Sequence, residues 1–482
     1  MTVLSLILRL IQSLLKRSPL YLAILGVAAV YAPNPVMAAE FEFHGDMNNR
    51  FQAYTNQRDW FRTGNSGGGT LKDSDPTESY GEMKYRFWFT AASDDGMVKG
   101  VYATEIGGIR FGEGSGGDFS GDGVNVETRW AYVDFALPGA VDQRLKIGLQ
   151  PVSVNANVWN ETATAAVLTG KLQSGIDYQL LWGRGDSTNE GANDSPADEG
   201  WDGADNFALN LDKHFSPNLN AGIFYLYQMN NQVAEGVGEI NSRNYELKLI
   251  ADNSEYSVSN LGATFDYNRE TSAGRLFLKG TAIAQTGTIE GVNFNPINGA
   301  VNPNTSYDLS TFLGRGELGL QFGPNTVTYT MVYASGDSNE QDSNFDAFIS
   351  TDVDLTDSMI FQENFTDDDY FAETPYILDK GYFLNKIQLD HKVRPNLKLS
   401  GMLVYNRLAE AITLADGSSS KDLGLEFGGR VSYLPYPSLE IAAEAAYLLA
   451  GDAVDALEEG ALQNGQSDKD IVHVAGRVRY KF

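Results

Sequence analysis

The chain has 482 residues and no cysteine, which excludes a disulfide framework and a thiolate metal site. Lys and Arg number 35 and Asp and Glu 63; three of the basic residues, Arg9, Lys16 and Arg17, precede residue 39, so the rest of the chain carries a net charge of about −31. Such an acidic balance argues against nucleic acid as a partner.

The first 38 residues have the order of an export signal. Lys16 and Arg17 precede an apolar run from Leu20 to Tyr31, and the small-residue site Val36-Met37-Ala38 follows. This order predicts a signal peptide, residues 1–38, cleaved after Ala38. The run is too short to cross a bilayer as a helix, and no later stretch qualifies. A membrane protein of this kind must be a closed barrel, so we expect residues 39–482 to form an outer-membrane β-barrel.

Segments of alternating polarity follow, separated in turn by short connections with turn residues and long connections rich in Gly, Asn, Asp and Ser. Bacterial barrels have short periplasmic turns, long extracellular loops and an even number of strands, and counting 162–172 as a strand satisfies these rules. The expected fold is all-β, an antiparallel transmembrane barrel of about 18 strands, or 16 if the hairpin at 255–286 belongs to a loop. The expected strands cover about 40–55, 79–92, 97–111, 125–137, 143–150, 162–172, 176–184, 204–214, 218–231, 255–268, 275–286, 309–322, 326–336, 380–393, 396–408, 421–434, 439–450 and 470–482.

The alternation also assigns faces. In the first strand, Phe41, Phe43 and Phe51 alternate with polar residues that include Glu42, Asp46 and Arg50. We expect the apolar face to contact lipid and the charged face to line the pore. The lumen should hold water, because eighteen strands enclose more space than side chains fill.

The last strand ends at the C-terminus with Tyr480-Lys481-Phe482. A terminal strand that closes on Phe resembles the C-terminal signature of bacterial outer-membrane barrels. The resemblance implies that Tyr480 and Phe482 form an assembly signal for the barrel-assembly machinery.

Residues 80–183 resemble the early strands of Gram-negative general porins in order and spacing. The likeness lies in Tyr85-Arg86-Phe87, Gly100-Val101-Tyr102, Thr128-Arg129-Trp130-Ala131-Tyr132-Val133 and Leu145-Lys146-Ile147-Gly148-Leu149-Gln150. It implies a water-filled channel for passive diffusion of ions and small hydrophilic solutes, in contact with outer-membrane lipid and lipopolysaccharide. It leaves open a homotrimer.

In that family, a long connection after the fifth strand folds into the barrel and forms the constriction, and here it would be Pro151–Glu161. The inward basic residues Lys84, Arg86, Arg144 and Lys146 would face Glu161 across the pore, and opposed charges of this kind set ion preference. The chain departs from the family in lacking the acidic Pro-Glu-Phe-Gly-Gly motif and in carrying Gln150 where many relatives have Arg. The alternative is that these residues are ordinary solvated charges of the lumen.

Residues 337–379 contain thirteen acidic residues and no Lys or Arg before the final Asp379. The spacing lacks the Gly and terminal Glu of an EF-hand. It favours a solvated, mobile, acidic extracellular loop over a calcium site. This loop and the net charge predict cation preference, unless basic residues at the narrowest point prevail over more distant charge.

The sequence offers little for catalysis or for a cofactor. His44 and Asp46 share a strand face, but no nucleophile motif accompanies them, so we expect lumen-facing polar residues and not an enzyme. We expect no metal site and no cofactor. The alternatives to a general porin are a channel selective for a sugar or an anion, an outer-membrane barrel enzyme, and a sheath for an electron-transfer partner.

Overall fold

The computed structural model describes residues 40–55, 78–112, 116–118, 123–139, 142–185, 204–230, 255–290, 306–339, 342–351, 353–362, 365, 376–414, 416–454, 456 and 470–482. The proposed signal peptide, residues 1–38, lies outside these ranges. Within them, no helix is long and apolar enough to span a bilayer.

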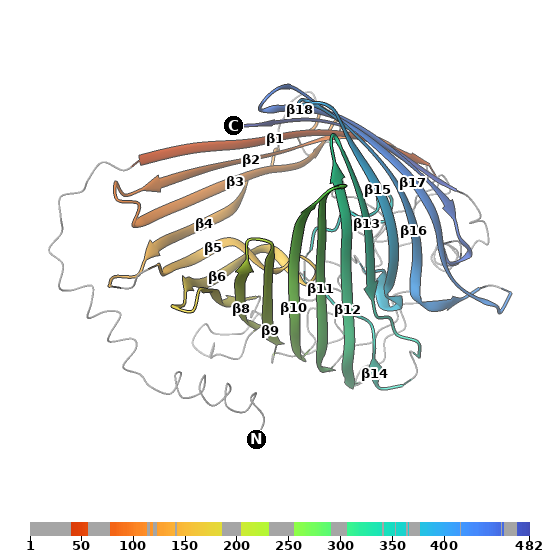
Figure 1. Cartoon of the computed structure of the whole chain (residues 1–482), viewed down its shortest axis with the longest axis horizontal. Helices are drawn as coiled ribbons and strands as arrows, with labels where there is room; N and C mark the ends of the chain where they lie inside the picture. The colour runs from red at the N-terminus through yellow and green to blue at the C-terminus, as the bar shows by residue number, and fades with distance from the viewer. Residues whose placement is uncertain are drawn as a thin grey trace.

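Nearly all of the described chain is one antiparallel sheet that closes on itself (Figure 1). Apart from the two-residue β14, each strand pairs with the wall strands before and after it, so the topology is a simple up-and-down barrel. The strands are β1 (Glu40–Thr55), β2 (Glu78–Ala92), β3 (Val98–Arg110), β4 (Glu127–Ala136), β5 (Arg144–Asn155), β6 (Trp159–Lys171), β7 (Ile176–Arg184), β8 (Asp205–Ser216), β9 (Leu219–Asn230), β10 (Glu255–Thr271), β11 (Gly274–Glu290), β12 (Ser306–Phe322), β13 (Asn325–Ala334), β14 (Asn344–Phe345), β15 (Tyr382–Arg394), β16 (Leu397–Thr413), β17 (Ser419–Tyr436), β18 (Leu439–Ala450) and β19 (Ile471–Lys481), with a short 3₁₀ helix η1 (Leu378–Lys380).

The barrel closes between its first and last strands. β1 pairs with β19 from Asp46 opposite Lys481 to Thr55 opposite Val472. Beyond the last strand residue, Gly45 and Phe482 exchange two backbone hydrogen bonds of 3.0 and 3.1 Å. The absence of a side chain at Gly45 is required here, since an added Cβ would lie 2.5 Å from the Phe482 ring. The C-terminal residue is therefore part of the seam.

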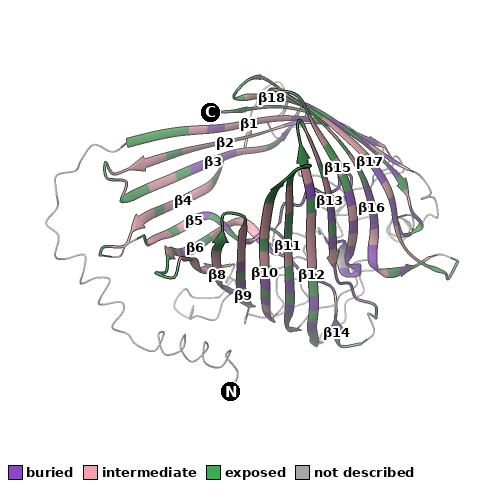
Figure 2. Cartoon of the chain, viewed as in Figure 1, coloured by how far each residue is buried: buried purple, intermediate pink, exposed green. Residues whose placement is uncertain are grey.

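The two faces of the wall differ as the alternation predicts (Figure 2). Large apolar side chains project outward and are exposed, for example Leu261 at 61% and Ile223 at 56%. Polar neighbours in the same strands point inward and are buried, for example Asn260. An apolar outer face and a polar inner face suit a strand between lipid and an aqueous lumen.

The predicted strand pattern is confirmed. The wall contains 18 strands, and β14 is an additional two-residue strand that pairs in parallel with Asp308 and Leu309 of β12, beyond the end of β13. The alternative of 16 strands is wrong, because β10 and β11 pair along their whole length and also pair with β9 and β12. The segment 162–172 is a strand, and it begins three residues earlier, at Trp159.

The prediction that Pro151–Glu161 forms an inward constriction loop is wrong. Pro151 continues β5 and pairs with Thr162, and Glu161 lies on β6 opposite Val152. Only a tight turn at 156–158 separates the two strands. The physical reason is that alternation continues through Val152 and Val154, both buried on the inner face, so the segment extends the wall.

For most of the described residues of 337–379, the prediction of a solvated loop is also wrong, whereas their place on the extracellular side stays a prediction. The described part of this segment folds into the barrel, where Phe348, Ile349, Ile360 and Phe361 are each at most 1% exposed. Its acidic residues alternate with these apolar side chains along the sequence. A count of charges alone therefore did not reveal that the apolar side chains would be buried. Apolar burial outweighs the cost of placing the few intervening carboxylates beside cations of the wall.

Deleting Phe482 should reduce the amount of barrel inserted in the outer membrane, because the deletion removes the final hydrogen-bonded pair of the seam and the ring that packs on Phe43 and Tyr480. The measurement is the heat-modifiable, folded fraction in isolated membranes. Deleting the ring alone with Phe482→Ala separates the two contributions. An unchanged folded fraction in both variants would contradict the prediction.

Candidate pore constriction

The described residues of 337–379, called here the lumenal strap, leave and rejoin the wall at one narrow neck between β13 and β15. The backbone N–H of Asp337 donates to the carbonyl of Asp379 at 2.6 Å. Gly336 allows the two arms to approach, since an added Cβ would lie 2.0 Å from the carbonyl oxygen of Lys380. Both ends of the strap are therefore held together at the rim.

A row of buried amide side chains fixes the first arm of the strap to the wall. Nε2 of Gln285 donates to the carbonyl of Ile349 at 2.9 Å, and the N–H of Ile349 donates back to Oε1 of Gln285 at 3.1 Å. This side chain pairs with the strap as a neighbouring strand would. The row continues through hydrogen bonds among inward residues of β8 to β12, namely Asn206, Gln228, Asn260, Gln285 and Thr311.

An ion pair holds the middle of the strap. The Asp357 carboxylate accepts hydrogen bonds from Arg315 at 3.1 Å and from Lys386 at 3.2 Å. Burial opposes ionisation of Asp357, but the two cations more than compensate and hold its pKa below the ordinary carboxyl range. A charged carboxylate is thus stable inside the barrel.

Next to this ion pair, a wall carboxylate binds the strap backbone. Glu426 on β17 accepts hydrogen bonds from the Ser358 hydroxyl at 2.6 Å and from the N–H of Met359 at 2.7 Å. Together with Asp357, this contact extends the anchored region of the strap from β8 to β17.

The described strap reaches two further parts of the wall. On one side, the Tyr376 hydroxyl donates to the carbonyl of Asn157, in the turn between β5 and β6, at 2.6 Å. On the other, the Phe365 ring lies beside the guanidinium carbons of Arg430 and Arg477, at 4.6 and 4.2 Å. The strap thus contacts the wall on both sides of β1–β4.

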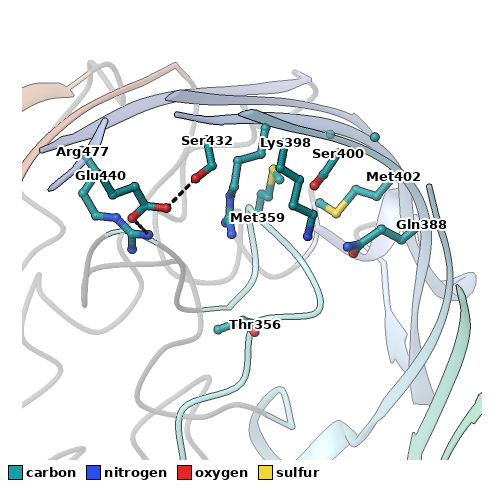
Figure 3. A pocket seen from close by; sticks show the side chains of 12 residues that line it. Thr356, Met359, Gln388, Lys398, Ser400, Met402, Ser432, Glu440 and Arg477 are labelled. Carbon is teal, nitrogen blue, oxygen red and sulfur yellow. Dashed lines mark hydrogen bonds and ion pairs between the residues drawn. The ribbon is translucent and has the colours of Figure 1, made fainter. Parts of the chain in front are cut away.

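A recess of about 190 Å³ separates part of the strap from the wall of β15–β19. Figure 3 shows Thr356 and Met359 of the strap on one side and wall side chains on the other. The wall supplies Gln388, Lys398, Ser400, Met402, Arg430, Ser432, Glu440 and Arg477. The strap is therefore packed less closely here than against β8–β12.

The inner face of β1–β4 carries a charged cluster, called here the basic sector. The carboxylate of Glu105 lies 3.4 Å from Lys84, 2.5 Å from Arg86 and 2.9 Å from Arg129. Arg50 and Glu82 form a second pair at 2.7 Å and are almost fully buried. Cations outnumber carboxylates within this cluster, although the whole chain is acidic.

The predicted pore residues fall into several places. Lys84 and Arg86 are brought together in the basic sector, with Arg50, as the sequence analysis expected of inward residues. Asp46 lies at the β1–β19 seam, where Arg479 donates to it at 2.8 Å. Glu42 lies 3.6 Å from His44, and the Asp46 carboxylate is bound by Arg479 instead of His44.

The remaining predicted residues do not form an eyelet with these. Arg144 binds Asp134 at 2.8 Å, near the short turn that follows β4, and Lys146 lies over the Tyr132 ring at 5.7 Å. Gln150 is fully buried and donates to the carbonyl of Ala165 at 2.8 Å. Glu161 approaches Arg129 from the same side of the wall, at 3.7 Å, and does not face it across the pore.

The sequence analysis missed the strap and its anchors. Gln285, Asp357, Phe365 and Glu426 were not singled out, because a polar residue on an inward face reads as solvated lumen. A signal was present in the strap itself, where residues 345–361 contain a run of large apolar side chains unlike the other long connections. The partners on the wall could not be found without the barrel register.

No family model and no curated protein matches the chain by sequence. Solved structures from Pseudomonas aeruginosa share its fold. OccK11 (OpdR) is 13% identical with a TM-score of 0.50 over 94% of this chain and 99% of that one. OccK8 (OprE) is 11% identical with a TM-score of 0.52 over 92% and 98%. The outer membrane protein OpdK is 10% identical with a TM-score of 0.52 over 92% and 99%, and OpdK is also known in a structure with vanillate.

Replacing Asp357 with Asn should release the middle of the strap, because it removes the partner of two cations, a change that costs roughly 3–5 kcal/mol for a buried ion pair. We expect larger and noisier single-channel currents. Asp346→Asn, which changes a half-exposed strap carboxylate away from this ion pair, is the control. Equal currents in wild type and Asp357→Asn would contradict the assigned role.

The same ion pair predicts a dependence on pH. The pKa of Asp357 is lower in the folded protein than in the unfolded chain, so its stabilisation is present above the unfolded value and is lost as pH falls through the folded value. Strap release should therefore appear only in acid, below the ordinary carboxyl range. Asp357→Asn should abolish this pH dependence while wild type retains it, which current recordings over a pH series can check.

Proposed function

We propose that this chain is an outer-membrane porin, a water-filled channel for passive diffusion of ions and small hydrophilic solutes. The observation that carries the proposal is a closed 18-stranded barrel, apolar outside, whose lumen contains an anchored strap. A wide barrel without an inward segment would sieve poorly, and a strap restricts the passage without any chemistry. The partners proposed are outer-membrane lipid and lipopolysaccharide, the barrel-assembly machinery, and, as an open alternative to a monomer, two further copies of the chain.

The charges of the basic sector support a channel that prefers anions along the wall of β1–β4. Four cations, Arg50, Lys84, Arg86 and Arg129, stand there with the two carboxylates Glu82 and Glu105, and a third carboxylate, Glu161, lies beside Arg129. Described acids of the strap are in part neutralised, as Asp357 is by Arg315 and Lys386. Local charge acts more strongly on a passing ion than charge beyond the Debye length of about 8 Å. The basic sector therefore favours anion preference, whereas the net charge of the chain alone predicts cation preference.

A channel selective for an anionic solute is the second candidate. It is favoured by the same basic sector and by the likeness of fold to OpdK, for which a structure with vanillate is known. A barrel enzyme has less support, since His44 and Asp46 do not pair, and a sheath role has no specific observation in its favour.

Planar-bilayer recordings of the purified barrel test the proposal. We expect stepwise conductance in salt and, in asymmetric salt, a reversal potential of the sign for anion preference. Bilayers that stay non-conducting with correctly folded protein would reject the channel. Hydrolysis of lipid or peptide that His44→Ala abolishes would favour the enzyme.

Neutralising the basic sector with Lys84→Gln and Arg86→Gln together should shift the reversal potential toward cations, because Glu105 then loses two partners within 3.4 Å. The shift should be larger in 0.1 M than in 1 M salt, where the Debye length falls to about 3 Å. The control is Lys171→Gln with Lys279→Gln, which removes equal charge from half-exposed pairs elsewhere on the wall. Equal shifts in both double variants would remove the special role of the sector.

A further inference from the structure

The recess between the strap and the wall of β15–β19 has the size of one six-membered ring. Its volume is about 190 Å³. For comparison, a protein cavity of about 150 Å³ accommodates benzene. Thr356 and Met359 of the strap line one side, and the polar wall lines the other (Figure 3). The recess therefore has room for one small cyclic solute.

The charged groups of the recess are neutralised by the wall itself. Three cations line it, and each has its own wall carboxylate within 3.0 Å: Lys398 has Asp390, Arg430 has Glu444, and Arg477 has Glu440. These charges sum to zero, whereas cations are in excess in the basic sector. An anion would give up its hydration without meeting an uncompensated cation. A neutral solute therefore fits the recess better than an anion.

The polar side chains of the recess have hydrogen-bonding groups left for a ligand. The Asp390 carboxylate accepts from Nε2 of Gln388 at 3.1 Å and from the Ser400 hydroxyl at 2.6 Å. It also orients Lys398, whose Nζ lies 3.0 Å away. The carbonyl oxygen of Gln388 and the lone pairs of Ser400 remain as acceptors, and Lys398 keeps further N–H donors. Hydroxyl groups both donate and accept, so a polyol can satisfy this mixed set.

The thioether side chains of Met359 and Met402 give the recess an apolar side. Both lie close to Gly428, where an added Cβ would be 2.9 Å from Sδ of Met359 and 2.6 Å from Cε of Met402. Methionine is flexible and adapts to the shape of what it contacts. A pyranose carries C–H groups on its ring faces and hydroxyl groups at its edge, so it matches a recess with one apolar side and one polar side.

We propose that the recess is a binding site for a neutral monosaccharide, with the ring against Met359 and Met402 and the hydroxyl groups on Gln388, Ser400 and Lys398. This inference rests on the proposed porin function and names one solute class for it. The site is separate from the basic sector, because it lies on other strands and carries no net charge. Binding should be weak, since a solute must leave a channel site as well as enter it.

The test is saturation-transfer NMR of the purified, folded barrel with D-glucose, D-galactose and D-mannose, a method that detects weak binding and needs no conduction. We expect at least one of these sugars to bind. The corresponding uronate has the same ring with a carboxylate, and it should bind more weakly. Absence of binding by all three sugars, or equal or tighter binding of the uronate, would overturn the inference.

Two variants locate the bound sugar. Thr356→Phe should abolish binding, because its ring fills the recess from the strap side, and Thr356 is an exposed residue. The matched control is Ser343→Phe, at an exposed strap residue outside the recess. Gln388→Met removes one acceptor and should weaken binding roughly 2- to 10-fold, as the loss of one hydrogen bond does. Its control is Gln179→Met on β7, outside the recess.

Both controls should bind sugar as wild type does. Unchanged binding in the two recess variants, or an equal loss in their controls, would overturn the site. If Thr356→Phe does not assemble, Gln388→Met tests the same recess from the wall, and its unchanged binding would overturn the site. A folded wild-type barrel that never conducts would reject the proposed function, whereas a conducting barrel that binds no sugar rejects only this inference.

Discussion

The requirement that backbone hydrogen bonds be satisfied away from water governs this structure. A strand in contact with lipid has no solvent to pair with, so the sheet cannot end in a free edge, and β1 must meet β19. The seam extends to the last residue, where Phe482 pairs with Gly45. Closure then imposes one inside and one outside on every strand, and the alternation of apolar and polar residues follows from it.

Closure with 18 strands also leaves a wide lumen, and the strap occupies part of it. The space inside is too wide for wall side chains to fill. The strap places apolar residues such as Phe348 and Ile360 into this space and buries them nearly completely. Its backbone polar groups need partners in turn, and inward amides and carboxylates of the wall, notably Gln285 and Glu426, supply them. Polar residues of the inner face therefore serve as anchors along β8–β17.

The anchors differ in kind along the strap. Against β8–β12 the contacts are buried hydrogen bonds that repeat from strand to strand, and near β12 and β15 a doubly paired carboxylate, Asp357, adds to them. Beside β17–β19 the strap adjoins a recess, and it contacts the wall through the hydrogen bonds of Glu426, through apolar packing of Ile360 and Phe361, and through the ring of Phe365. Between this edge and Tyr376 lies the basic sector, whose charges include Lys84 and Arg86. A passage next to that wall would meet a local excess of cations.

Local alternation along the chain was sufficient to determine the barrel. Period-two polarity, turn residues and the even-strand rule located all 18 wall strands, including the weak one that begins at Trp159, because strand pairing with chain neighbours requires only local information. The same pattern assigned Lys84, Arg86 and Arg50 to the inner face.

Which inward segment narrows the lumen was decided only by the tertiary structure. The strap's contacts join Gln285 to Ile349 and Phe365 to Arg430 and Arg477, residues brought together by closure and by register around the barrel. The family resemblance placed the constriction at 151–161, yet the alternation of Val152 and Val154 continued the wall there, and burial of apolar side chains drew residues 345–361 inward despite their acidic neighbours.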